Sequence, residues 1–164
     1  MAETNRVVLG IDPGTGKCGW SVVRKAKNKS TELLDCGCVE TKANTPLPDR
    51  LELIASELEK VIKKHSPGEL AIEEIFFVKN VKTGISVAHA RGVAILVGKR
   101  AKLDIFEYKP NVIKLSVAGY GHATKDQMIK MVGLQVRNCK ITQDDTIDAI
   151  AVALCHIEGV RLPS

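Results

Sequence analysis

The sequence R-V-V-L-G-I-D-P-G-T-G spans residues 6–16 and decides the fold of this chain. Its apolar, β-branched run ends at a Pro-Gly turn, which predicts a strand buried on both faces and closed by a tight turn. Asp12 stands at the last position of that strand. A carboxylate there is costly to bury without a partner. Asp12 is therefore either a turn residue that bonds its own backbone or a carboxylate of a metal or phosphate site, and this stretch favours neither.

Size and composition predict one globular domain over residues 1–164. The chain is 45% hydrophobic, and none of its apolar runs approaches the ~18 residues of a membrane span. The first residues, M-A-E-T-N-R, lack an apolar signal region, and an odd number of cysteines, five, suits a reducing compartment. We therefore expect a cytoplasmic protein. The net charge of +5 is compatible with a polyanionic partner but fits an ordinary lysine-rich protein better.

Strand and helix patterns follow one another along the rest of the chain. After the first strand, two more strands with short links predict an antiparallel meander, and helices then separate the remaining strands. The expected strands are 19–25, 31–40, 69–77 and 104–108, and the expected helices are 49–65, 85–100, a short helix after Pro110, 124–136 and 144–158. Thr124 and Gln127 form a capping-box pattern at the start of one helix, and Thr142 is the expected cap of the last.

The strand that contains L-A-I-E repeats the logic of the opening stretch, because its buried residues run directly into Glu73. A helix separates this strand from the meander, so a crossover and a parallel pairing with the first strand are expected. The carboxyl ends of parallel neighbours lie at the same sheet edge. Asp12 and Glu73 are therefore expected to lie close together.

The last helix, D-D-T-I-D-A-I-A-V-A-L-C-H, supplies two further carboxylates. Asp145 and Asp148 are three residues apart and share one helix face, where like charges are unfavourable without a cation. Acidic residues near a helix start also serve as ordinary dipole partners, but Asp148 lies inside an apolar helix. Four carboxylates without matching bases indicate Mg²⁺ or Mn²⁺, and two such ions can hydrolyse a phosphodiester. A basic rim could then hold a phosphate backbone; its candidates are Lys79, Lys82, Arg91, Lys109, Lys114 and Lys125.

The helix expected at 85–100 is rich in alanine and glycine, which permits close backbone approach. Packing on the sheet and a homodimer seam explain this composition equally well.

In order and spacing, these elements resemble the RNase H-like superfamily, and more narrowly the RuvC family of bacterial Holliday-junction resolvases. The resemblance covers about residues 7–157. It is carried by G-I-D-P-G at 10–14, A-I-E-E-I-F at 71–76, K-N at 79–80, A-R-G-V-A at 90–94, G-Y-G-H-A-T-K at 119–125 and D-T-I-D-A-I-A at 145–151. It implies an α/β, RNase H-like fold with a five-stranded mixed sheet, three antiparallel strands followed by parallel ones, flanked by helices.

The same resemblance implies roles for individual residues. The metal-binding catalytic carboxylates would be Asp12, Glu73, Asp145 and Asp148. The DNA-binding residues would include Phe76, which would stack on bases near the crossover, together with Lys79, Lys82, Lys114 and Lys125. A core role is the alternative for Phe76.

The resemblance further implies an enzyme that uses Mg²⁺ or Mn²⁺, with two ions per site, to nick four-way DNA junctions symmetrically in recombination and repair. The products would carry 5′-phosphate and 3′-hydroxyl ends. A homodimer would match the two-fold symmetry of the junction, and the branch-migration proteins RuvA and RuvB are further expected partners.

Three other functions compete with this hypothesis. G-I-D-P-G-T-G also resembles the phosphate loop of actin-like and sugar-kinase ATPases, but the chain lacks their length and a second D-x-G. A junction-binding protein without catalysis would not need four carboxylates. A nuclease of the same fold that acts on RNA–DNA hybrids or other branched DNA is the alternative that the sequence separates least well.

Overall fold

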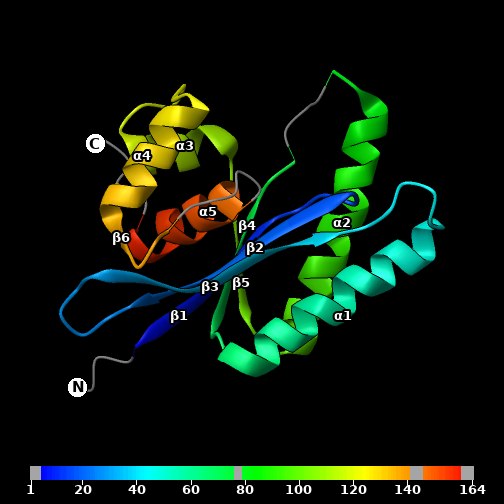
Figure 1. Cartoon of the computed structure of the whole chain (residues 1–164), viewed down its shortest axis with the longest axis horizontal. Coiled ribbons are helices and arrows are strands. Elements are labelled where there is room, and N and C mark those ends of the chain that lie inside the picture. The colour runs from blue at the N-terminus through cyan, green and yellow to red at the C-terminus, as the bar shows by residue number, and fades with distance from the viewer. Residues whose placement is uncertain (1–4, 76–78, 141–145, 160–164) are drawn as a thin grey trace.

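The computed structural model describes residues 5–75, 79–140 and 146–159, which form an α/β fold around one mixed sheet (Figure 1). The strand order is β5-β4-β1-β2-β3-β6. β1 to β3 pair antiparallel, whereas β4 is parallel to β1, β5 to β4 and β6 to β3. The strands are β1 Arg6–Asp12, β2 Lys17–Lys25, β3 Thr31–Glu40, β4 Glu69–Glu73, β5 Asp104–Tyr108 and β6 Val136–Arg137. The helices are α1 Leu47–His65, α2 Val81–Arg100, α3 Pro110–Ala118, α4 Lys125–Gln135 and α5 Ile147–Glu158.

The expected α/β class and strand directions are confirmed, but the predicted count of five strands is wrong. The sheet has six strands, because β6 pairs with the start of β3 through Thr31 and Val136. Two residues are too few to show a period-2 pattern, and Val136 was expected to belong to the helix that the capping box of Thr124 and Gln127 begins. That helix ends at Gln135.

Other element boundaries also differ from expectation: β2 and α1 each begin two residues early, at Lys17 and Leu47. β4 ends at Glu73 rather than extending to residue 77, although Glu74 N–H still donates to the Tyr108 carbonyl oxygen at 2.8 Å. α2 begins at Val81, four residues early, because the Asn80 side chain accepts a hydrogen bond from Lys82 N–H and caps it. α5 begins at Ile147, and the expected cap Thr142 lies outside the described residues.

The helices form a layer on each face of the sheet (Figure 1). α1 and α2 bury Ile54, Leu58 and Ala94 against one face. α3, α4 and α5 form the other layer, where α5 is the central element. Its residues from Ile147 to Ile157 are all buried except Asp148, so the helix is enclosed on all sides apart from this position in its first turn. Among the described residues, no helix is long and apolar enough to cross a membrane.

Two contacts bring α5 unusually close to the sheet. A methyl group added at Gly10 of β1 would lie 2.2 Å from the Ala149 carbonyl oxygen and 2.8 Å from Ala153 Cβ. Ser21 Oγ of β2 donates to the same Ala149 carbonyl oxygen at 2.9 Å. The helix can therefore rest on the strands only because Gly10 has no side chain, and this contact is next to Asp148.

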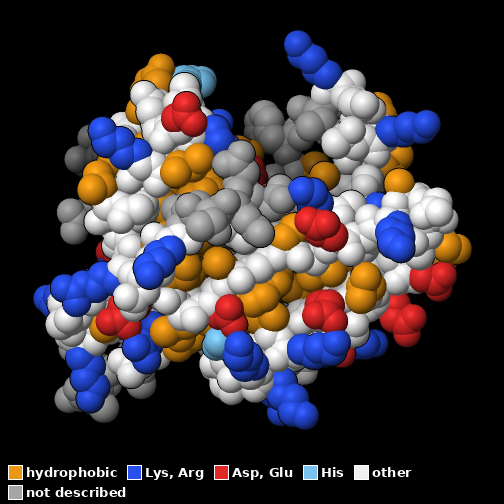
Figure 2. Space-filling view, in the orientation of Figure 1, with side chains coloured by type: hydrophobic (Ala, Val, Ile, Leu, Met, Phe, Trp, Pro, Cys, Tyr) orange, Lys and Arg blue, Asp and Glu red, His pale blue; other side chains and the backbone are white. Residues whose placement is uncertain are grey.

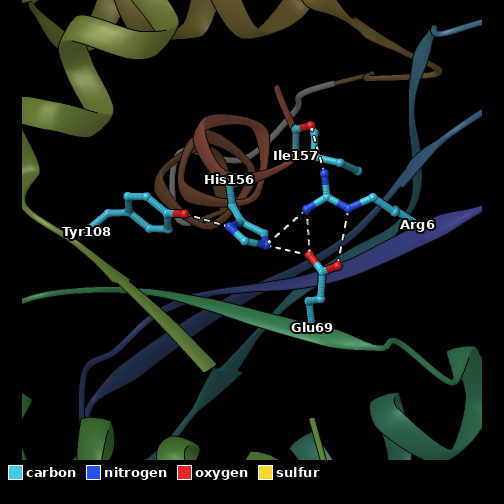
Figure 3. Close-up of polar contacts among 5 residues, drawn as sticks. All are labelled: Arg6, Glu69, Tyr108, His156 and Ile157. Atoms are coloured by element: carbon cyan, nitrogen blue, oxygen red, sulfur yellow. Dashed lines mark hydrogen bonds and ion pairs between the residues drawn. The ribbon is translucent and has the colours of Figure 1, made fainter. Parts of the chain in front are cut away.

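A polar network holds the other end of α5 (Figure 3). His156 bonds through Nε2 to Glu69 of β4 at 2.5 Å and through Nδ1 to the Tyr108 hydroxyl at 2.6 Å. Arg6 of β1 adds an ion pair with Glu69 at 2.7 Å and a long bond to the Ile157 carbonyl oxygen. Burial lowers the pKa of His156, and the Arg6 guanidinium lowers the pKa of Glu69. The network thus fastens α5 to β1, β4 and β5.

Candidate active site

Asp12 and Glu73 lie at the same edge of the sheet, as the parallel pairing predicted. Ile11 of β1 is opposite Ile72 of β4, so the next residue of each strand is one of the two carboxylates. Both strands are buried up to that point, and both carboxylates are half-buried where the chains leave the sheet. The fold therefore presents two acidic groups from rigid strand ends.

Asp148 approaches the same place from α5. It lies in the first turn of the helix, and its side chain lines a small pocket together with Glu73, Lys114 and Met128. The contact of Gly10 with Ala149 sets the height of this turn above β1. Three elements that are far apart in the sequence thus bring their carboxylates to one end of the sheet.

The electrostatics of Glu73 show that the three carboxylates act on one another. The pKa of Glu73 is raised to about 7, first because the side chain is desolvated and then because Asp12 and Asp148 are negative neighbours. Lys114 opposes this rise but does not cancel it. Burial and the two negative neighbours therefore outweigh the effect of Lys114 on Glu73.

Two lysines contribute positive charge at this site. Lys125, at the start of α4, places Nζ 3.0 Å from Asp148 Oδ2. Lys114 of α3 lines the pocket with Glu73 and Asp148. Both lysines are therefore next to the carboxylates, on the helical layer that faces them.

The donor set fits a hard divalent cation. Carboxylate oxygens are the ligands that Mg²⁺ and Mn²⁺ prefer, and a cation among these groups would offset both the desolvation of Glu73 and its repulsion by Asp12 and Asp148. In the described part of the chain, no three acidic, histidine or cysteine side chains stand close enough together to form a finished metal cluster. Asp148 is instead paired with Lys125, whose Nζ lies 3.0 Å from Asp148 Oδ2.

The other predicted site residues are not gathered here. Lys79 and Lys82 are exposed on either side of Asn80 at the start of α2 and do not line the pocket of Glu73 and Asp148. Asp145 and Phe76 lie outside the described residues. On the face seen in Figure 2, Lys and Arg side chains are spread over the periphery rather than collected in one patch.

Arg91 supports Glu73 in a way that the sequence did not indicate. Its Nε donates to the Glu73 carbonyl oxygen at 3.3 Å, and its guanidinium forms an ion pair with Glu107 of β5. Arg91 therefore braces the end of β4 against α2 and β5 and is not a free cation of the basic rim. The sequence marked Arg91 as a candidate for the basic rim and as part of the A-R-G-V-A motif, but neither signal specifies its partners.

Comparisons with known proteins identify the family of this chain. The family model described as crossover junction endodeoxyribonuclease RuvC matches residues 8–156. A crossover junction endodeoxyribonuclease RuvC of Brachyspira hyodysenteriae is 45% identical over 156 residues, which are 95% of this chain and 96% of that protein. The RuvC of Finegoldia magna is 46% identical over 155 residues, 94% of each chain.

A solved structure of T. thermophilus RuvC in complex with Holliday junction substrate has a TM-score of 0.86 and 30% identity, and the match covers 92% of each chain. The family model spans all three converging elements, from β1 to α5. The chain therefore belongs to the RuvC family of crossover junction endodeoxyribonucleases.

Proposed function

We propose that this protein resolves four-way DNA junctions by metal-dependent, paired nicks near the crossover. The observation that carries the proposal is that Asp12, Glu73 and Asp148 lie at one end of the sheet, where burial first and the two neighbouring carboxylates second raise the pKa of Glu73 to about 7. The similar T. thermophilus protein was solved with a Holliday junction substrate, and that supports the same substrate class here.

The proposed reaction is hydrolysis of a phosphodiester. A water oxygen bonds to phosphorus, the bond from phosphorus to the 3′ oxygen breaks, and the products carry a 5′-phosphate and a 3′-hydroxyl. Bound Mg²⁺, in two sites, would lower the pKa of the attacking water and stabilise the departing oxygen. Asp12, Glu73, Asp148 and Asp145 are the residues we propose as its ligands.

The residues of the site have separate tasks in this scheme. The rigid ends of β1 and β4 fix Asp12 and Glu73, and α5 fixes Asp148. Glu73 must be ionised to bind a cation. Lys114, beside Glu73, is placed to meet a phosphate oxygen, whereas Lys125 balances the charge of Asp148 at 3.0 Å.

The proposed contacts with DNA extend beyond this centre. We propose that Phe76 stacks on a base and that Lys79 and Lys82, both exposed, bind the backbone of a junction arm. We further propose that residues 1–164 act as one nuclease domain in the cytoplasm, and that RuvA and RuvB supply the junction.

A homodimer is the proposed working form. The inner face of α2 packs on the sheet through Ala90, Ala94 and Gly98. Its outer face leaves a helical stripe of exposed apolar residues, namely Val81 at 72%, Ile85 at 53% and Leu96 at 51% exposure, with Ala88 and Gly92 between them. The buried small residues fit packing on the sheet, and the exposed stripe supports the proposal of a dimer seam on the opposite face. A second copy on the outer face would provide the second nick that a two-fold junction requires.

One experiment separates this function from its alternatives. A synthetic four-way junction, a linear duplex, a branched flap and an RNA–DNA hybrid are each incubated with Mg²⁺ or with chelator. Paired nicks on the junction alone, lost with chelator, are expected. Preferred cutting of the hybrid or the flap would favour another nuclease of this fold, and binding without cutting would favour a non-catalytic protein.

Two variants make that assay specific for the site. Asp12→Asn should abolish cutting and retain junction binding. Glu59→Gln, which changes an exposed carboxylate on α1, should cut like the wild type. Wild-type nicking by Asp12→Asn would refute the proposed role of this carboxylate.

A further inference from the structure

The loop between α3 and α4 is fastened beside the carboxylate site. Gly119 ends α3 in the left-handed conformation with φ 73°, and its N–H donates to the Leu115 carbonyl oxygen. Ala123 N–H then donates to the Tyr120 carbonyl oxygen at 3.2 Å and closes a turn. The capping box of Thr124 starts α4 one residue before Lys125, which contacts Asp148. The loop therefore has a defined shape next to the proposed cleavage centre.

This loop presents an aromatic ring that the fold does not use. Tyr120 is 58% exposed, and its ring meets that of His122 edge-on with centroids 5.7 Å apart. Tyr108, in contrast, is half-buried and bonded to His156. An exposed aromatic face beside a DNA-cutting site is a stacking surface for a base.

A cavity adjoins the ring and completes the surface. It has a volume of about 270 Å³ and is lined by Ala118, Tyr120, Ala123, Gln127, Lys130 and Met131. Its small apolar residues suit the flat face of a base, and the Lys130 ammonium is a cation for a backbone phosphate. Gln127 uses its side-chain oxygen to accept Thr124 N–H at 2.9 Å, so its amide N–H groups serve as donors for a base edge. Asp126, which precedes Gln127 on α4 and is exposed, is an acidic neighbour of this surface.

We infer that Tyr120 and this cavity bind an unpaired nucleobase of the DNA strand that runs through the cleavage site. The inference rests on the proposed function and deepens it. Tyr120 precedes Lys125 by five residues, so at most about 18 Å of extended chain separates them. A base held here would thus lie within a few nucleotides of the scissile phosphate. Only DNA with unstacked bases, such as a junction near its crossover, would engage the ring.

The test uses a junction that carries 2-aminopurine near the crossover, because the fluorescence of this base reports its stacking. Tyr120→Ala should lose the fluorescence change that wild type produces and should nick the junction about 5- to 150-fold more slowly, the range that corresponds to losing one base–aromatic stack. Tyr120→Phe should restore both. Binding of linear duplex and the melting temperature should change little, since the ring is exposed.

Leu134→Ala is the matched control, because Leu134 is 72% exposed on the same helical layer but does not line the cavity. It should nick and fluoresce like the wild type. If Tyr120→Ala nicks within two-fold of wild type and keeps the fluorescence change, the inference is overturned while the proposed function stands. Absence of nicking by the wild type would instead contradict the proposed function.

Discussion

Replacement of Gly10 by alanine tests how closely α5 must approach the sheet. The new methyl group would lie 2.2 Å from the Ala149 carbonyl oxygen, whereas ordinary contacts are 3.4 Å or more. Relief requires β1 and α5 to separate by about 1 Å, and overpacking of this kind costs about 1–3 kcal/mol. The bond from Ser21 Oγ to the same oxygen would also be lost, at about 1 kcal/mol. The lower backbone entropy of alanine returns about 0.5–1 kcal/mol.

We therefore expect Gly10→Ala to destabilise the protein by about 1–3.5 kcal/mol, which lowers the melting temperature by roughly 2–14 °C in a chain of this size. The nicking rate should also fall in the protein that remains folded, because Asp148 precedes Ala149 and moves with it. A displacement of about 1 Å at a catalytic group can cost on the order of 100-fold in rate.

The assay combines thermal unfolding with junction nicking at 20 °C, where both proteins remain folded. Gly133→Ala is the control, since a methyl group there meets nothing within 4 Å; it should gain up to about 1 kcal/mol and nick normally. A Gly10→Ala protein that melts within 1 °C of wild type and nicks within two-fold of it would refute the close packing of β1 on α5.

Three further predictions concern other parts of the molecule. Burial lowers the pKa of His156 below 6.5 in the folded protein, so the unfolded chain protonates this side chain at a higher pH than the folded one, and the free energy of unfolding should fall as the pH drops below about 6.5. The pKa of Glu69 is also lowered by folding, so the free energy of unfolding should fall further below pH 4.5. Denaturant titrations should show a flatter pH dependence between pH 7 and 5 for His156→Gln, and equal slopes would contradict the assignment. Leu96→Glu should convert the proposed dimer to a monomer in sedimentation, whereas Leu134→Glu should not; a dimer that survives Leu96→Glu excludes this stripe. Lys114→Ala should slow nicking and reduce the salt dependence of junction binding by about one phosphate contact, and an unchanged salt slope would argue against a phosphate role.

The main elements could be predicted because their signals are local. The apolar runs before Asp12 and Glu73 identify buried strands, and the helix between them implies a parallel crossover, so both carboxylates had to meet at one edge. β6 could not be predicted, because two residues carry no periodicity. The early start of α2 was missed because its signal is a single Asn80 side-chain bond, in a stretch with weak helical periodicity.

The interactions around the site were less predictable than its carboxylates. Lys125 pairs with Asp148, Arg91 braces Glu73, and both contacts join residues 18 or more positions apart. Charge and spacing indicate which side chains are available but not which partner each selects after folding. The tight approach at Gly10 is hidden for the same reason, since a glycine before Ile-Asp-Pro reads first as part of a strand and turn.

Titration of Mn²⁺ into the protein, followed by calorimetry at pH 8, tests most directly whether the converging carboxylates share a cation. At this pH Glu73, with its pKa of about 7, is ionised. We predict that the wild type binds Mn²⁺ and that Asp12→Asn, Glu73→Gln and Asp148→Asn each lose most of this affinity and all junction nicking, while Glu59→Gln keeps both. Undiminished Mn²⁺ binding and nicking by the three site variants would contradict the account.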